Sequence, residues 1–145
     1  MTNNMMTTGI TRSDVRALLL EYGITPTQQR LEIAQILFAR PQHLSAEQVL
    51  AKLNQEKPKA SKATIYNTLG LFAGKGLIRE LIVDPTKVFY DSNTSDHHHF
   101  YNVDTGELSD VPKDSNMVVD NLPNLPAGTE AESVDIIFRI RNSKR

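Results

Sequence analysis

Residues 61–90, SKATIYNTLGLFAGKGLIRELIVDPTKVFY, decide the predicted fold. Ser61 offers a hydroxyl cap for a helix, and the apolar residues behind it recur at helical spacing: Ile65, Leu69 and Phe72. Two β-prone runs follow, over 77–83 and 88–90, and the turn-forming residues 84–87 separate them. A helix followed by a hairpin is the order in which a winged helix ends.

Three further helices are predicted upstream. Residues 11–14 form a capping box for a helix that Gly23 ends. The run Thr25-Pro26-Thr27-Gln28 puts a hydroxyl at the N-cap and proline at the first position of a second helix, which extends to about Arg40. Residues 45–48 cap a third helix, whose apolar residues are Val49, Leu50 and Leu53. These helices complete a winged-helix domain over 11–90, preceded by a tail over 1–10.

The pattern changes after residue 90. A polar hinge over 91–96 leads to a strand over 97–103, a turn and a second strand over 108–111. Further elements are predicted along the rest of the chain: a short helix over 113–121 with Met117, Val118 and Val119 inside, a loop over 122–128, and a strand over 133–140. These residues, about 55 in all, bury little surface alone. We therefore expect an α+β protein whose second domain, over 97–145, forms a homodimer.

Composition excludes several functional classes. Of the 145 residues, 39% are hydrophobic and 23% charged, as in a globular protein, and none is cysteine, which excludes thiolate metal sites and cysteine nucleophiles. No apolar run approaches the roughly 20 residues of a membrane span, and the N-terminus does not resemble a secretory signal, so we expect a cytoplasmic protein. Residues 1–90 hold 11 basic and 7 acidic residues, whereas residues 91–145 hold 5 and 10. A basic half suggests a polyanionic partner, although two differing solvated surfaces would give the same counts.

Three consecutive histidines, His97, His98 and His99, are the most unusual local feature. On a strand, His97 and His99 lie on one face and His98 on the other. Two imidazoles at this spacing can bind a metal ion or haem iron, although three solvated histidines remain an alternative. Donors that the fold can add come from the hairpin, the hinge and the winged helix: Asp110, Tyr90, Asp91 and His43. His43 also fits a plain loop histidine.

Several motifs together resemble the ferric uptake regulator family. The resemblance rests on Thr25-Pro26 with Arg30, on residues 43–47 (HLSAE), on residues 63–69 (ATIYNTL), and on the histidine cluster after the hairpin. Residues 96–101 (DHHHFY) and 135–141 (DIIFRIR) resemble the iron response regulator branch. The family consists of metal-sensing bacterial repressors, so the resemblance implies a winged-helix DNA-binding domain followed by a dimerisation domain.

The resemblance also implies a ligand set. The family's metal ligands fall on His43, His97, His99 and Asp110, while the glutamate expected at the end of the hairpin falls on Tyr90. A second family site would use Asp96 and His98, but its third ligand falls on Val134. The Cys-x-x-Cys positions read Asn102 and Thr105, which excludes a cysteine-ligated structural zinc. The iron response branch implies haem at the histidine cluster (His97, His98 and His99), whereas its Cys-Pro haem motif is absent.

The predicted function is therefore that of a dimeric regulator that binds A/T-rich promoter duplex according to iron status, sensed through haem or through iron, manganese or zinc. The predicted DNA contacts are Arg30, Ser61, Lys62, Thr64, Tyr66, Asn67 and Lys87. Tyr66 could instead belong to the core. A winged-helix protein-interaction adaptor is the alternative function. An enzyme is disfavoured, because no nucleophile with a base, phosphate loop or His-Glu-x-x-His element accompanies the histidines.

Overall fold

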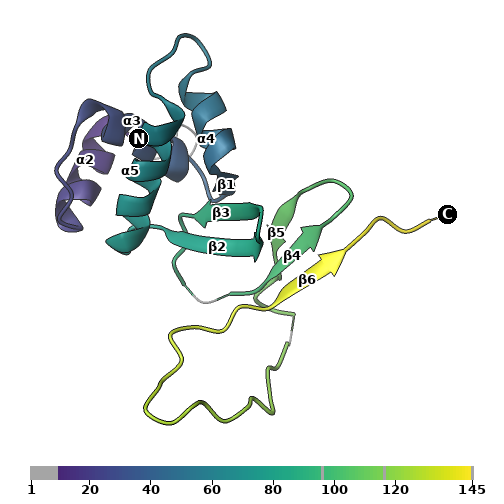
Figure 1. The fold of residues 1–145 in the computed structure, drawn as a ribbon. Helices are drawn as coiled ribbons and strands as arrows, with labels where there is room; N and C mark the ends of the chain where they lie inside the picture. Colours follow the sequence, from purple (N-terminus) through teal and green to yellow (C-terminus); the bar gives the residue numbers. More distant parts are fainter. Residues whose placement is uncertain (1–9, 96, 116, 145) are drawn as a thin grey trace. The chain divides into compact units, whose positions relative to one another are not determined.

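A computed structural model of the chain describes residues 10–95, 97–115 and 117–144. The chain divides after Thr94 into two units, which are described separately. From residue 10 onward, the first unit contains four helices and a three-stranded sheet (Figure 1). Its elements, in order, are α2 (Arg12–Glu21), α3 (Gln28–Phe38), β1 (His43–Ser45), α4 (Ala46–Leu53), α5 (Lys62–Gly74), β2 (Arg79–Asp84) and β3 (Lys87–Asp91).

Side-chain caps start the helices largely where the sequence predicts. Thr11 and Asp14 form the capping box of α2, and Ser45 and Gln48 form that of α4. The hydroxyl of Ser61 accepts the backbone N–H of Thr64 at the start of α5. These three predicted helix starts are confirmed, whereas residues 1–9 of the predicted tail over 1–10 lie outside the described residues.

The predicted N-cap of α3 is wrong by two residues. Thr27 is the N-cap, because its hydroxyl accepts the backbone N–H of Arg30 at 3.3 Å. Thr25 uses its backbone carbonyl instead, which accepts a hydrogen bond from the Arg30 guanidinium at 2.9 Å. Pro26 therefore precedes the helix, which ends at Phe38 before the predicted Arg40.

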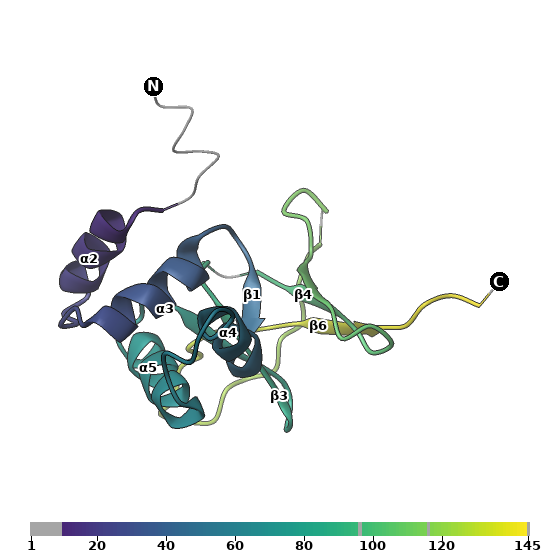
Figure 2. The ribbon, with the colours of Figure 1, turned by 90° about the horizontal axis from the view of Figure 1, so that it is seen from above.

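The sheet of the first unit has the order β1-β3-β2, with both pairs antiparallel. The hairpin of β2 and β3, which we call the wing, confirms the predicted strands, whereas β1 falls in a stretch for which the sequence predicts no strand. Helices α3, α4 and α5 lie against one another (Figure 2). The fully buried side chains of this unit come from each of its described helices and include Val15, Leu19, Ile33, Val49, Ile65, Leu69 and Phe72.

Asn54 organises the loop between α4 and α5. Its Oδ1 accepts the backbone N–H groups of Lys59 and Ala60, at 2.8 and 3.2 Å, and its Nδ2 donates to the Ala60 carbonyl at 2.9 Å. One side chain therefore satisfies three backbone groups immediately before the Ser61 cap, and it fixes where α5 begins.

We expect Asn54→Ala to lower the free energy of unfolding by about 1–3 kcal/mol, because it removes the side chain that bonds part-buried backbone N–H and C=O groups. Urea denaturation followed by the helical circular dichroism signal measures the change. Gln55→Ala is the matched control, since Gln55 is exposed, and a surface change of this kind alters stability by no more than about 0.5 kcal/mol. Equal midpoints for the two variants would contradict this role of Asn54.

The described residues of the second unit form a three-stranded sheet of order β5-β4-β6. The strands are β4 (His99–Asn102), β5 (Leu108–Asp110) and β6 (Ile137–Ile140), with β4 antiparallel to β5 and parallel to β6. The predicted strands over 97–103, 108–111 and 133–140 are thus present but shorter. No helix in the described part of the chain is long and apolar enough to cross a membrane.

The predicted helix over 113–121 is wrong. Residues 113–115 form a turn and a bend, and residues 117–121 are irregular. Met117, Val118 and Val119 are consecutive, so they cannot share one helical face, and Val118 is 81% exposed. Without a buried stripe, this segment gains nothing by forming a helix.

Asn102 organises the turn between β4 and β5. Its Oδ1 accepts the backbone N–H groups of Asp104 and Thr105, at 2.9 and 3.2 Å. Its Nδ2 donates to Oδ1 of Asn142, whose own backbone N–H donates to Asp104. Hydrogen bonds thus join the turn to the segment after β6. Asn102 and Thr105 stand at the Cys-x-x-Cys positions, where the sequence excludes a cysteine-ligated zinc.

Candidate functional site

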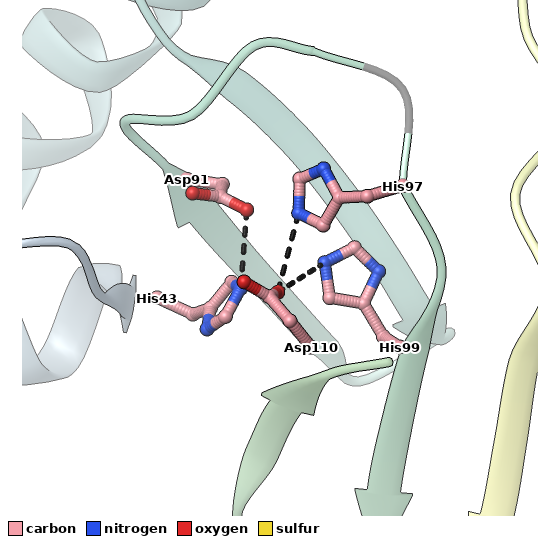
Figure 3. Close-up of side chains that lie close together, drawn as sticks. All are labelled: His43, Asp91, His97, His99 and Asp110. Atoms are coloured by element: carbon pink, nitrogen blue, oxygen red, sulfur yellow. Dashed lines mark ion pairs between the residues drawn. The ribbon is translucent and has the colours of Figure 1, made fainter. Parts of the chain in front are cut away.

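His43 and Asp91 form the first candidate set of metal ligands. The β1–β3 register places the two residues directly opposite one another, and His43 Nε2 lies 3.1 Å from Asp91 Oδ2 (Figure 3). Their side chains are only 11% and 5% exposed. His43 is therefore not a plain loop histidine, because the pairing of β1 with β3 places it in a largely buried imidazole–carboxylate pair.

His97, His99 and Asp110 form the second set. The β4–β5 register places His99 opposite Asp110, and both histidines reach Asp110 Oδ1 through Nε2, at 3.2 Å from His97 and 3.4 Å from His99 (Figure 3). The two imidazole rings lie 4.5 Å apart. The predicted alternation therefore brings His97 and His99 together on one carboxylate.

The hydrogen bonding of His97 fits a metal ligand. Its Nδ1 lies 2.7 Å from the Ser95 carbonyl oxygen, which can only accept, so Nδ1 carries a proton. A neutral His97 then presents the Nε2 lone pair to Asp110 Oδ1, and two acceptors attract only when a proton or a metal ion lies between them. Metal-binding histidines commonly donate their second ring N–H to a backbone carbonyl in this way.

The donor types restrict which ions fit. Two imidazoles and one carboxylate are the donors of many Fe²⁺ sites, and carboxylates also suit Mn²⁺. Asp91 and His43 offer the same two donor types. The absence of cysteine from the sequence leaves only nitrogen and oxygen donors, so the residues fit iron, manganese or zinc.

His98 has a different environment from its two neighbours. Its Nδ1 accepts the backbone N–H of Ile136 at 3.1 Å, so this nitrogen joins the residue before β4 to the residue before β6. His97 and His98 also border a cavity of about 400 Å³ in the second unit, whose other lining residues include Val111, Lys113 and Met117. Of the second family site, Asp96 lies outside the described residues and Val134 has no donor atom in its side chain.

The outer face of α5 carries most of the predicted DNA contacts. Lys62 and Asn67 are exposed, and Tyr66 is 41% exposed, which excludes the alternative that Tyr66 belongs to the core. Lys62 Nζ lies 5.9 Å from the centre of the Tyr66 ring, within cation–π range. Lys87 is exposed at the first position of β3, on the wing.

The other predicted contacts have roles inside the first unit. Ser61 caps α5, and its hydroxyl lies 3.1 Å from that of Thr64. Arg30 is half-buried and donates to the Thr25 carbonyl. These side chains help to fix the start of a helix, α5 for Ser61 and Thr64 and α3 for Arg30.

The structure adds two residues to the predicted sets. Asp91 stands beside His43, one residue after Tyr90, the position where the resemblance places a glutamate. Burial, followed by the charge of Glu80, raises the pKa of Tyr90 to about 12, so its hydroxyl stays protonated and is a poor metal ligand. Glu47 is the second addition, because it accepts a hydrogen bond from Tyr66. Asp91 has a signal in the sequence, as a carboxylate at the hinge, whereas Glu47 has none.

Comparison with known proteins identifies the family. The model of the ferric uptake regulator family matches residues 21–137. The peroxide-responsive repressor PerR of Staphylococcus aureus (strain Mu50) is 33% identical over 94 residues, which are 65% of this chain and 64% of that relative. The match therefore spans slightly less than two thirds of the relative's length.

Solved structures show the same fold. The ferric uptake regulator of Vibrio cholerae aligns with a TM-score of 0.68 at 22% identity, over 89% of this chain and all of its own chain. That of Pseudomonas aeruginosa, solved with manganese, aligns with a TM-score of 0.64 at 24% identity, over 89% of this chain and 98% of its own. The family match, which covers most of the sequence, establishes that the chain belongs to the ferric uptake regulator family.

Proposed function

We propose that this chain is a metal-responsive transcription regulator that binds promoter DNA as a homodimer. The observation that carries the proposal is the set of His97, His99 and Asp110, whose donor types and hydrogen bonding suit a divalent ion. The exposed polar face of α5 supports DNA binding, since such a helix fits the major groove.

A single divalent ion bound by His43, His97, His99 and Asp110, with Asp91 as a fifth ligand, is the proposed sensor site. Donor number supports this set, because neither the pair nor the triad supplies the four to six ligands that zinc, iron or manganese ions take. When bound, the ion supplies positive charge and a fixed ligand geometry. His43 and Asp91 belong to the DNA-binding unit, so ion binding and DNA affinity are expected to be coupled.

Two kinds of DNA contact are proposed. Tyr66 and Asn67 read base edges in an A/T-rich operator, and Ser61 and Thr64 lie at the end of α5 that approaches the groove first. Three basic residues contact phosphates: Arg30, Lys62 and Lys87. Phosphate contacts fix the register of the protein on the duplex, whereas base contacts choose the sequence.

The proposed function is tested by measuring DNA affinity with and without metal. A duplex selected by the protein from a randomised pool in the presence of Mn²⁺ serves as the operator, and a shuffled duplex of the same composition serves as the reference. We expect Mn²⁺ to strengthen binding to the selected duplex and a chelator to reverse the effect. An adaptor would bind neither duplex.

We expect Asn67→Ala to weaken binding to the selected duplex about tenfold and to leave the shuffled duplex nearly unchanged. The reason is that asparagine can bond adenine through two hydrogen bonds, worth about 1–3 kcal/mol of discrimination. Fluorescence anisotropy over a salt series measures both affinities. Lys87→Ala is the control, because loss of a phosphate contact weakens both duplexes and flattens the salt dependence by about one unit. Equal losses for Asn67→Ala on the two duplexes would exclude base reading by Asn67.

Haem is the second candidate ligand, as in the iron response branch. The cavity of about 400 Å³ beside His97 and His98 favours it, since ligand cavities have volumes of about 300–1,000 Å³. Titration of haem followed by its absorption band tests this possibility. His98→Ala should weaken haem binding and spare Mn²⁺ binding, because His98 borders the cavity and its Nδ1 accepts the backbone N–H of Ile136.

A peroxide response is a further candidate, because the relative from Staphylococcus aureus is a peroxide-responsive repressor. The sensor set proposed here contains only histidines and aspartates. The test compares DNA binding of the Fe²⁺-loaded and Mn²⁺-loaded protein after hydrogen peroxide treatment. Loss of binding confined to the iron form supports this response.

A further inference from the structure

Glu47 connects α4 with the outer face of α5. The hydroxyl of Tyr66 donates a hydrogen bond to Glu47 Oε2 at 2.5 Å. Glu47 lies in the first turn of α4, behind the Ser45–Gln48 capping box, and its side chain is exposed. The bond therefore lies on the surface of the first unit and joins two helices through the side chain of a proposed base-reading residue.

The Glu47 carboxylate is charged and surrounded by groups assigned to DNA contacts. The hydrogen bond from Tyr66 is the largest influence that lowers the pKa of Glu47, followed by a backbone hydrogen bond and by the charges of Lys62 and Lys87. The same hydrogen bond raises the pKa of Tyr66, so the phenol keeps its proton. An acidic side chain within a surface assigned to phosphate binding weakens the attraction for DNA of any sequence. We therefore expect Glu47 to have another role in DNA recognition.

The direction of the hydrogen bond defines that role. A phenol has one proton, and the proton of Tyr66 is committed to Glu47. The exposed Tyr66 oxygen can then only accept. In the major groove, adenine N6 and cytosine N4 present amino donors, whereas guanine and thymine present acceptor oxygens. A Tyr66 held in this state favours an adenine or a cytosine and disfavours the other two bases.

We propose that Glu47 is the positioning residue that sets the base preference of Tyr66, by holding its ring and by taking its only hydrogen-bond proton. The inference rests on the proposed DNA-binding function and adds a specificity determinant to it. The bond joins two exposed side chains, so its loss has little effect on folding.

Two variants separate the charge of Glu47 from its reach. Glu47→Asp keeps the charge but shortens the side chain by one methylene, so the bond to Tyr66 is lost. Glu47→Gln removes the charge but keeps an acceptor oxygen at the same reach. Tyr66→Phe removes the donor. Glu21→Gln, an exposed change of equal charge at the end of α2, is the control.

The experiment compares affinities for the selected duplex and its shuffled counterpart, with Mn²⁺ present and with thermal unfolding as a check on folding. We expect Glu47→Asp and Tyr66→Phe to lower the ratio of the two affinities about tenfold, or about 1.4 kcal/mol, the value of one hydrogen bond between Tyr66 and a base. Glu47→Gln should keep most of the wild-type ratio of the two affinities, while it strengthens binding to both duplexes. In the Tyr66→Phe background, Glu47→Asp should have no further effect on the ratio.

A second measurement tests the direction of the bond. Adenines and cytosines of the selected duplex are replaced, one at a time, by analogues that lack the exocyclic amino group. At one position, the loss of the amino group should weaken binding of the wild-type protein to the duplex about tenfold. The same change should weaken binding of the Tyr66→Phe variant less than twofold. If no position behaves in this way, or if Glu47→Asp keeps the wild-type ratio, the inference is overturned. If the wild-type protein selects no sequence at all, the proposed function itself fails.

Discussion

Replacement of both His97 and His99 by alanine is expected to lower the affinity for Mn²⁺ at least about 1,000-fold and to abolish the effect of Mn²⁺ on DNA binding. The two side chains share Asp110 Oδ1 as a neighbour and supply both nitrogen donors of the second set. Loss of an outer-shell partner alone typically costs about 10–100-fold in metal affinity, so removal of two direct ligands costs more. Calorimetric titration with Mn²⁺ and anisotropy with the selected duplex measure the two effects.

The matched control is His98→Ala, which changes the histidine between them. Its Nδ1 is bonded to the backbone of Ile136, so this variant should keep the Mn²⁺ affinity within about threefold, well below the 10–100-fold typical of lost second-shell partners. Circular dichroism verifies that the double variant keeps the wild-type fold. A folded double variant that retains the full response to Mn²⁺ would exclude the histidine cluster as the sensor.

Local signals in the sequence account for most of the first unit. Helices α2, α4 and α5 begin at capping residues that are recognisable within four consecutive positions, and the wing follows from two β-prone runs around a turn. The start of α3 is ambiguous because two threonines flank Pro26, and only the hydrogen bond from Arg30 distinguishes them. Strand β1 escapes prediction because it is three residues long and exists through pairing with residues far along the chain.

The second unit is harder to predict for a related reason. Its parallel partner strand, β6, joins β4 far along the chain and begins at Ile137, four residues later than the predicted strand. Just before β6, the Ile136 carbonyl accepts the backbone N–H of His99 at 3.0 Å. The helix predicted over 113–121 rested on three apolar residues without helical spacing. Propensity without periodicity is a weak guide in a segment that buries little surface.

The two candidate ligand sets share one construction. In each, a histidine and an aspartate lie directly opposite one another on antiparallel strands, His43 with Asp91 and His99 with Asp110. The second pair is predictable, because a short hairpin fixes its register. The first is not, because the register of β1 against β3 depends on how α4 and the wing pack. This difference explains why the predicted ligand set includes Asp110, whereas Asp91 is named only as a possible donor at the hinge.

Asp91→Asn provides the corresponding test of the first set. Asp91 Oδ2 lies 3.1 Å from His43 Nε2, and its Oδ1 accepts the backbone N–H of Asn93 at 2.8 Å. Asparagine can keep the bond to Asn93 but loses the negative charge and the second carboxylate oxygen. We expect the affinity for Mn²⁺ to fall about 10–100-fold, the range for a ligand or for the partner that orients one.

The comparison with His43→Ala decides what Asp91 does. If Asp91 is a ligand in its own right, Asp91→Asn lowers Mn²⁺ affinity further in the His43→Ala background, and the two losses add. If Asp91 only orients His43, the double variant binds Mn²⁺ no more weakly than His43→Ala alone. Tyr90→Phe is the control, because a phenol whose pKa is raised to about 12 is protonated at neutral pH and contributes no ligand. An unchanged Mn²⁺ affinity in Asp91→Asn and in His43→Ala would confine the metal site to His97, His99 and Asp110.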